Sequence, residues 1–225
     1  EATNPCAEQP LPSYGCCCLG SVNLSKLVVD YFTDKALLNW GLLATVVQIA
    51  VRMLDNVLDL SFWPLEKQRA EAMAKRRIGL GFTGLGDALL MLGIKYDSEE
   101  GRQMAAQITE FMRDNAYRAS VELAKEKGAF AIFKADGYLQ SPFIQRLPKD
   151  LQRDIKKFGI RNSHLLSIAP TGTLSLAFCD NTSNGIEPNF TWTYDRVKVM
   201  RDGSKQTYPV MSYGYRVFLA NGGDP

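Results

Sequence analysis

A carboxamide, a thiol and a carboxylate alternate near the start of the chain, at Asn4, Cys6 and Glu8. Cysteine is a nucleophile and a good hydrogen-atom donor, glutamate is a general base, and asparagine can both donate to and accept from a hydroxyl. One tight loop could therefore present all three groups to a substrate. The alternative is a proline-rich surface loop that happens to contain a cysteine, because short motifs often occur by chance.

Three adjacent cysteines, Cys16, Cys17 and Cys18, follow in a short apolar segment. If this segment is a strand, Cys17 points to one face while Cys16 and Cys18 point to the other. The sequence lacks the two spaced pairs of ligands that are typical of a structural zinc site, so we predict no metal site. For Cys16 and Cys18 the alternative is packing in the apolar core, a role that free cysteine fills readily.

A turn that holds Gly172 between Thr171 and Thr173, flanked by Pro170 and Leu174, follows an apolar run and precedes a possible helix. Backbone N–H groups in such a turn can hold a phosphate, and a helix N-terminus adds partial positive charge. The turn is not a Walker A loop, since no Gly-Lys-Ser/Thr follows it. An ordinary turn at the end of a strand is the alternative.

Gly79, Gly81 and Gly84 formally satisfy the pattern G-x-G-x-x-G. A dinucleotide site needs a strand immediately before this pattern, but a polar, helix-like run, Gln68–Arg77, precedes it here. We therefore favour close backbone packing at a helix junction. A nicotinamide-dependent oxidoreductase that uses these glycines remains the alternative from another class of enzyme. A strand entering Gly79 would support it, and a helix there would exclude it.

The composition is that of a globular domain, with 46% hydrophobic residues, 22% charged residues and a net charge of +2. This balance indicates neither a nucleic-acid partner nor a membrane partner. The most apolar stretch, Leu42–Leu60, is interrupted by polar residues, so no membrane span is predicted. No signal peptide is visible, and an odd number of cysteines, five, argues against a secreted disulfide scaffold. Both features fit the cytoplasm.

The elements that position these groups are helices alternating with short buried strands, which predicts the α/β class. Helices are predicted for 39–60, 65–77, 87–92, 98–127 and 150–158. Ser98 is the expected N-cap of the longest helix, and Gly128 is its expected end. Strands are predicted for 16–24 and 165–169, with a loop at 1–15 and a loop-to-strand segment at 185–190.

Two groups of ionisable residues are given no catalytic role. Asp55 and Asp59 fall on one helix face, which we interpret as a solvated face rather than an acid/base pair. His164 is the single histidine and has no partner for a metal site or a catalytic triad. The chain starts at Glu1 rather than methionine and ends in a loop-like segment, so we expect it to be a piece of a longer protein.

Five segments, in this order, resemble motifs of ribonucleotide reductase catalytic subunits, and together they are far more specific than any one alone. The finger-loop signature N-P-C-G-E-Q-P-L resembles 4–11, and Y-G-x-C-x-L-G-S-I-N-L resembles 14–24. The motif R-x-I-G-L-G-x-x-G-L-A-D is similar to 76–87, A-P-T-G-T-I-S to 169–175, and S-G-I-E-P to 184–188.

The resemblance implies that the ribose 2′-hydroxyl of a ribonucleotide is reduced by radical chemistry, which supplies deoxyribonucleotides for DNA replication and repair. Cys6 matches the cysteine that becomes a thiyl radical and abstracts the 3′-hydrogen. Glu8 matches the base that takes the 3′-hydroxyl proton, and Asn4 matches the residue that hydrogen-bonds the substrate hydroxyls. Cys17 matches one of two redox cysteines that form a disulfide. Residues 170–174 match the loop that holds the substrate phosphate.

The fold implied by the resemblance is the ten-stranded α/β barrel with a finger loop through its centre. The whole chain, 1–225, would be part of this catalytic barrel domain, with the finger loop at 1–15 and the phosphate loop at 169–175. A thiyl radical needs a buried site, because water and oxygen would quench it. The partner redox cysteine, the allosteric nucleotide site and a C-terminal cysteine pair are expected outside the segment, so the segment alone is expected to be inactive.

The sequences of the motifs are most similar to those of the adenosylcobalamin-dependent class II enzymes. Adenosylcobalamin is therefore the expected cofactor, although no site for it is identifiable in the segment. A class I large subunit that catalyses the same reaction is an alternative, and a non-catalytic relic or assembly module is another. Thioredoxin or glutaredoxin is the implied reductant, and a homodimer is possible. The departures from the family pattern are Ala7 in place of glycine, Asn184 in place of serine, and the extra cysteines Cys16 and Cys18.

Overall fold

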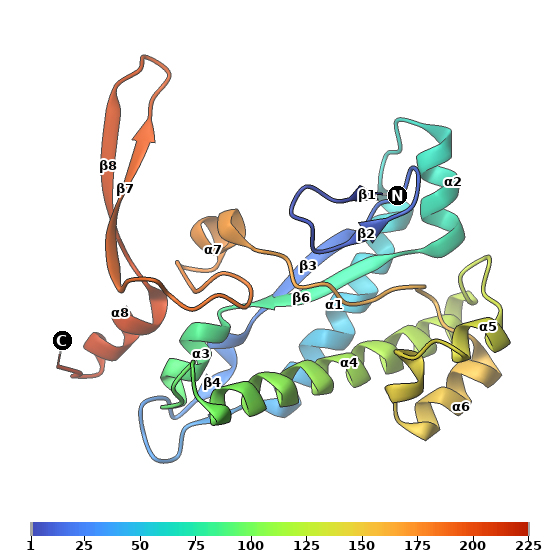
Figure 1. The fold of residues 1–225 in the computed structure, drawn as a ribbon, viewed down its shortest axis with the longest axis horizontal. Helices are drawn as coiled ribbons and strands as arrows, with labels where there is room; N and C mark the ends of the chain where they lie inside the picture. Colours follow the sequence, from blue (N-terminus) through green and yellow to red (C-terminus); the bar gives the residue numbers. More distant parts are fainter. Residues whose placement is uncertain (1, 225) are drawn as a thin grey trace. The chain divides into compact units, whose positions relative to one another are not determined.

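The computed structural model describes residues 2–224, in which helices alternate with short strands (Figure 1). The chain divides into two compact units. One contains 2–22, Trp40–Gly81 and Ala106–Ala169, and the other contains Asn23–Asn39, Phe82–Ala105 and 170–224. The predicted α/β class is confirmed. Within the described residues the strands form four two-stranded sheets, and no closed barrel is present.

The first unit contains the N-terminal hairpin, two long helices and a fully buried strand. Its elements are β1 (Ala2–Thr3), β2 (Pro10–Leu11), β3 (Cys18–Asn23), α1 (Trp40–Leu60), α2 (Glu66–Lys75), β6 (Ile78–Thr83), α4 (Glu99–Lys127), α5 (Ala135–Leu139), η2 (Ile144–Arg146) and α6 (Lys149–Phe158). Strands β3 and β6 and helix α4 each have an end in the second unit.

Every residue of β6 is buried, and the strand has a neighbour on either side. It pairs with β3 in one sheet. On the other side, the Leu80 N–H donates to the Leu165 carbonyl at 2.7 Å, and the Ser167 N–H donates to the Leu80 carbonyl at 3.1 Å. The strand predicted at 165–169 is therefore present only as an extended segment with a single parallel bridge, Leu80 to Leu166.

The glycines of the G-x-G-x-x-G pattern explain how these strands come so close. Gly79 and Gly81 lie inside β6, and α2 rather than another strand precedes them. A Cβ at Gly81 would lie 2.3 Å from the Ser167 carbonyl oxygen, and one at Gly79 would lie 2.8 Å from the Cys17 Sγ. A pyrophosphate-binding turn would instead follow its strand. Close backbone packing is confirmed, although it occurs between strands and not at a helix junction.

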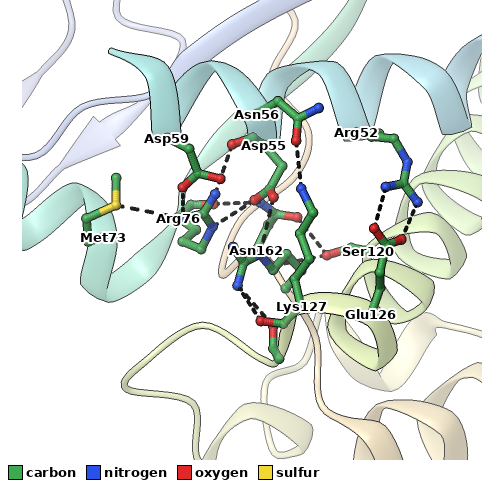
Figure 2. Close-up of polar contacts among 12 residues, drawn as sticks. Arg52, Asp55, Asn56, Asp59, Met73, Arg76, Ser120, Glu126, Lys127 and Asn162 are labelled. Atoms are coloured by element: carbon green, nitrogen blue, oxygen red, sulfur yellow. Dashed lines mark hydrogen bonds and ion pairs between the residues drawn. The ribbon is translucent and has the colours of Figure 1, made fainter. Parts of the chain in front are cut away.

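Helices α1 and α4 lie alongside each other and run in the same direction. Trp40 contacts Phe111 edge to face, with 5.0 Å between ring centroids. The middle of α1 is joined to the last turns of α4 through the ion pair between Arg52 and Glu126, 2.6 Å long (Figure 2). Both of these side chains are about half exposed, so the pair contributes little to stability. Most of the stabilisation comes from the apolar face of α1.

Asp55 of α1 is fully buried and forms the centre of a polar network (Figure 2). Arg76 donates Nε to Asp55 Oδ1 at 2.8 Å, and Arg161 donates Nε to Oδ2 at 3.2 Å. Asn162 donates Nδ2 to Oδ1 at 2.9 Å. Burial by itself raises the pKa of Asp55, but the hydrogen bonds and charges of Arg76 and Arg161 outweigh burial and hold the pKa below its usual value. The predicted solvated face is therefore wrong for Asp55, whereas Asp59 is partly exposed.

Helix α1 is long and apolar enough to cross a membrane by length and composition alone, with a mean hydropathy of 1.4. Core helices of globular proteins pass the same test. Here Leu43, Val47 and Leu54 are buried, and Asp55 is paired with arginines of the same unit. In this structure one face of α1 therefore packs in the core of the first unit, while Leu42, Ile49 and Met53 on the same helix are exposed.

The second unit is built from short elements around α3. They are η1 (Leu24–Leu27), β4 (Val28–Val29), β5 (Leu37–Leu38), α3 (Leu85–Met91), α7 (Gly172–Phe178), β7 (Thr193–Val199), β8 (Lys205–Met211) and α8 (Tyr213–Ala220). Strands β7 and β8 pair antiparallel, from Thr193 opposite Met211 to Val199 opposite Lys205. The segment 185–190 is a loop, and the strand after it begins only at Thr193.

The predicted helices are confirmed as α1, α2, α3, α4 and α6. Ser98 caps α4 as expected, since its Oγ accepts the Gly101 N–H at 3.0 Å. Gly128, with a φ of 83°, follows the end of the helix. The predicted strand at 16–24 is β3, which begins at Cys18. The predicted loop at 1–15 contains a small hairpin formed by β1 and β2.

Candidate active site

The first candidate segment is a closed loop at the end of a β-hairpin. Strands β1 and β2 pair Ala2 with Leu11 and Thr3 with Pro10. The Asn4 N–H donates to the Gln9 carbonyl at 3.1 Å, and the Gln9 N–H donates back to Asn4 Oδ1 at 3.1 Å. Asn4 therefore closes the loop with its side-chain oxygen, which leaves Nδ2 as the group that could donate to a substrate hydroxyl.

The tip of this loop presents Cys6 to solvent. Cys6 is an exposed free thiol, and Ala7 after it has a φ of 62°. This left-handed conformation is the one that glycine adopts at no cost, so Ala7 stores strain of about 1 kcal/mol here. Alanine in place of the family's glycine is therefore strained at this position.

The Glu8 carboxylate is buried without a hydrogen-bond partner. Both of its oxygens are shielded from solvent, and neither has a partner in the described part of the chain. Only the backbone of Glu8 is anchored, through its carbonyl, which accepts the Ser167 Oγ at 3.3 Å. Because burying a carboxylate without a partner is costly, the arrangement indicates a group whose missing partner is a ligand.

Cys17 lies between the hairpin and β6. Its Sγ packs against Gly79, and Glu8 is among the groups whose charge acts on its thiol. Burial raises the pKa of Cys17 to about 12, with Arg77 opposing this shift. Burial also raises the pKa of Cys16 and of Cys18. All three side chains are therefore neutral thiols near pH 7, the form that can give up a hydrogen atom.

The second candidate segment, at 170–174, is held in shape by the Thr171 side chain. Thr83 Oγ1 donates to the Ser183 carbonyl at 2.9 Å, so its proton is used there. The contact of 2.9 Å between the Thr83 and Thr171 hydroxyls must then use the Thr171 proton, and Thr171 Oγ1 also accepts the Gly185 N–H at 2.8 Å. The Thr171 hydroxyl therefore positions the loop and is not available to donate a hydrogen bond to a phosphate.

The first turn of α7 offers backbone amides to a ligand. Gly172 begins the helix, and no atom lies within 4 Å of the position that a Cβ would take there. Thr173 is exposed, so its hydroxyl remains a candidate donor. The N–H groups of a first helical turn have no partner within the helix. The amides of Gly172, Thr173 and Leu174 could therefore meet phosphate oxygens, as predicted.

A family model described as ribonucleotide reductase, barrel domain, matches residues 1–212 of the chain. The chain belongs to this family. A vitamin B12-dependent ribonucleoside-diphosphate reductase of Mycobacterium tuberculosis is 40% identical over 201 residues, which cover 89% of this chain and 26% of that protein. An enzyme of the same name from Thermoplasma acidophilum is 37% identical over 199 residues, which cover 87% of this chain and 23% of that protein.

The similarity extends to reductases whose names do not mention vitamin B12. A ribonucleoside-diphosphate reductase subunit alpha of Chlamydia muridarum is 36% identical over 196 residues, covering 77% of this chain and 18% of that protein. The chain thus spans about a quarter or less of the length of these relatives. The resemblance drawn from the sequence motifs is confirmed at the level of the family.

The predicted site residues of this ribonucleotide reductase segment fall into two groups. Asn4, Cys6, Glu8 and Cys17 belong to the first unit, and 170–174 belong to the second. The relative placement of the units is not determined, so a ribose and its phosphate bridging Cys6 and Gly172 stays a prediction. No group of metal-ligating side chains occurs in residues 2–224, and the His164 ring forms a hydrogen bond of 2.9 Å with the Ser163 Oγ.

Asp87 supports the second group and was missed as a site residue. It is buried, and it accepts the Ser183 N–H at 2.8 Å, Asn189 Nδ2 at 2.6 Å and the Gly214 N–H at 3.3 Å. Burial raises its pKa, and these three hydrogen bonds oppose the shift. Asp87 thereby fixes the segment whose Gly185 holds Thr171. Its position at the end of the motif at 76–87 was the available signal.

Proposed function

We propose that the protein containing this chain reduces ribonucleotides to deoxyribonucleotides by thiyl-radical chemistry. The observation that carries the proposal is the Glu8 carboxylate, whose two oxygens are buried without partners on the loop that presents Cys6. A bound ribose would supply the missing hydrogen-bond donors. The names of the relatives, which are ribonucleoside-diphosphate reductases, support the same substrate class.

The proposed roles of the residues are those that the resemblance to ribonucleotide reductases implies, and the chemistry of each side chain is suited to its role. Cys6, as a thiyl radical, takes the 3′-hydrogen, while Glu8 accepts the 3′-hydroxyl proton and Asn4 donates Nδ2 to a hydroxyl. The 2′-hydroxyl leaves as water when Cys17 and a second cysteine outside this chain give up two hydrogen atoms and form a disulfide. Ribonucleotide and two thiols thus become deoxyribonucleotide, disulfide and water, and the hydrogen held by Cys6 returns to the 3′-carbon.

The proposal includes the ten-stranded barrel, of which residues 1–225 form a part. The finger loop is 1–15, and the phosphate loop is 169–175. The hairpin shape of 2–11 supports an inserted finger, since its paired strands allow a short loop to reach away from its base. The rest of the barrel would then shield the Cys6 thiol that is exposed in this segment, as radical chemistry requires.

Adenosylcobalamin is the radical source that the names of two relatives favour. When bound, it supplies a carbon-centred radical by cleavage of its cobalt–carbon bond. The exposed Cys6 thiol is open to such a source, but the described residues contain no set of side chains that identifies a corrin site. The proposal therefore gives no residue of this chain a role in binding the cofactor. It states only that the radical source can reach the Cys6 thiol.

The redox partner that we propose is a thioredoxin or glutaredoxin, which would reduce the disulfide of Cys17 after each turnover. A reducing compartment such as the cytoplasm fits five free cysteines. The proposal includes a homodimer only because the resemblance to the family implies one. These partners concern the whole protein rather than this segment.

The experiment that tests the function is an assay of the full-length protein for deoxyribonucleotide formation, with a dithiol reductant, in the presence and absence of adenosylcobalamin. Product formed only with adenosylcobalamin supports the proposal in full. If product formation instead requires a separate radical-generating subunit, the proposed reaction is supported and adenosylcobalamin is wrong as the radical source. Absence of product under both conditions, from folded protein that binds nucleotide, would remove the proposed function.

Replacement of Gly172 by valine is expected to raise the substrate KM strongly. The open space at this position accommodates the side chain, so the fold should be kept, but the branched side chain blocks the approach of phosphate oxygens to the first-turn amides. Losing charge-assisted hydrogen bonds costs about 1–3 kcal/mol, or roughly 5- to 150-fold in KM.

Steady-state kinetics of the full-length variant would measure this change. Ala177→Val, on the exposed side of the same helix, is the matched control and should leave KM within about twofold. An unchanged KM in Gly172→Val would mean that the phosphate lies elsewhere.

A further inference from the structure

Arg77 is a buried cation without an ion pair. Its side chain is only 8% exposed, and it forms no salt bridge with any residue that the structure describes. The neighbouring Arg76 and the partly exposed Arg161 both pair with Asp55. Arg77 instead donates Nη1 to the Pro10 carbonyl at 3.3 Å, which ties it to β2 of the finger hairpin. A guanidinium has five N–H donors, so this cation retains capacity for an anion.

The nearest thiol to the base of β6 is that of Cys17. Arg77 lies immediately before β6 and two residues before Gly79, and the Cys17 Sγ would be 2.8 Å from a Cβ at Gly79. Cys17 and Arg77 therefore lie at the same end of β6. The charge of Arg77 opposes the effect of burial on the pKa of Cys17 more than any other group does. Arg77 also lowers the pKa of Cys16, and it is not among the influences on Cys18.

The other charged and titratable groups near this pair cannot replace Arg77. Glu8 and the two neighbouring thiols disfavour an anion at Cys17. Glu71 faces Arg77 and Cys16 but forms its ion pair with Lys75, at 2.5 Å. His164, on the other side, is held neutral by burial and by the positive charges of Arg77 and Lys75. Arg77 is therefore the single cation among the groups that act on the Cys17 sulfur.

We propose that Arg77 is a positioning residue that stabilises negative charge on Cys17. This inference rests on the proposed function for its purpose. When an external thiolate attacks the partner sulfur of a Cys17 disulfide, a new disulfide forms and Cys17 leaves as a thiolate, which later takes a proton from water. A thiolate leaves faster when it is better stabilised, so a fixed guanidinium beside Cys17 favours this cleavage.

The test is the rate of alkylation of Cys17 by iodoacetamide in the full-length protein, measured by mass spectrometry of the peptide as a function of pH. Cys16→Ala and Cys18→Ala in the background leave Cys17 as the one thiol between Tyr14 and Lys26, and fragmentation of the peptide separates its alkylation from that of Cys6. Arg77→Met should lower the rate at pH 8 about three- to tenfold and move its pH profile upward, since one pKa unit changes the thiolate fraction tenfold. Arg77→Lys should recover most of the rate.

Lys75→Met is the matched control, since it removes a cation two residues away that is not among the influences on Cys17. Its rate should equal that of the parent. Equal rates in Arg77→Met and the parent would overturn the proposal. If Arg77→Met does not fold, Arg77→Lys decides, because a folded lysine variant with a rate below a third of the parental value would show that the positive charge is not what matters. The measurement needs no turnover, so it can fail or succeed independently of the proposed reaction.

Discussion

Serine in place of Cys6 is expected to abolish deoxyribonucleotide formation by the full-length protein while nucleotide binding is retained. The hydroxyl differs from the thiol by one atom, so the loop closed by Asn4 and Gln9 should keep its shape. Its O–H bond is much stronger than an S–H bond, however, and cannot relay a radical to the substrate. Each 1.36 kcal/mol added to a barrier costs tenfold in rate, so a loss on the order of 10³-fold or more is expected.

Product formation and equilibrium binding of the nucleotide would be measured side by side. Cys18→Ser is the matched control, because Cys18 is a half-buried thiol at the start of β3 to which no role in turnover is assigned. It should retain most of the activity. Cys6→Ser with activity close to the parental level would remove Cys6 from the radical step, whatever reaction the protein catalyses.

Asp55→Ala is expected to destabilise the fold by about 3–5 kcal/mol, because it breaks a buried ion pair by removing one partner. Asp55 is fully buried, and its carboxylate accepts hydrogen bonds from Arg76, Arg161 and Asn162. Its removal leaves Arg76, which is 5% exposed, with only the partly exposed Asp59 as an anion. Denaturant unfolding of parent and variant would measure the difference.

The pH dependence of this difference provides a second check. The pKa of Asp55 is lowered in the folded state, so its stabilising contribution is complete above the unfolded pKa, about 3.9, and is lost as pH falls through the folded value. The gap between parent and Asp55→Ala should therefore narrow below about pH 4. Asp59→Ala, on the same helix and partly exposed, should cost less than about 1 kcal/mol. Equal losses from the two substitutions would contradict the central role of Asp55.

Local rules account for the parts of the fold that the sequence could predict. The helix at 98–127 has a serine cap, an apolar period and a terminal glycine, and α4 begins and ends where these signals lie. The β7–β8 hairpin also had a local signal, because Asp202 and Gly203 form a turn in which Gly203 has a φ of 82°. An Asp-Gly pair between two β-rich runs is a hairpin signal, so this element could have been predicted.

Long-range contacts account for what the sequence could not predict. The burial of Asp55 depends on Arg161, 106 residues away, and the anchoring of Asp87 depends on Ser183, 96 residues away. Contacts between residues so far apart in the sequence produce no periodic pattern of apolar and polar residues that could predict them. The Thr171 hydroxyl likewise holds its loop in place through a hydrogen bond to Thr83, which lies 88 residues earlier. The residues of the candidate site were predicted by type and motif, whereas the residues that support them became visible only in three dimensions.

A crystal structure of the full-length protein with a bound ribonucleotide tests the account most directly, because it fixes how the two groups of site residues lie around one substrate. The account predicts the Cys6 Sγ within about 3–4 Å of the 3′-carbon and the Glu8 carboxylate within about 3 Å of the 3′-hydroxyl. The substrate phosphate should accept hydrogen bonds from the amides of Gly172, Thr173 and Leu174. A ribonucleotide bound with its ribose away from Cys6, or with its phosphate away from 170–174, would contradict it.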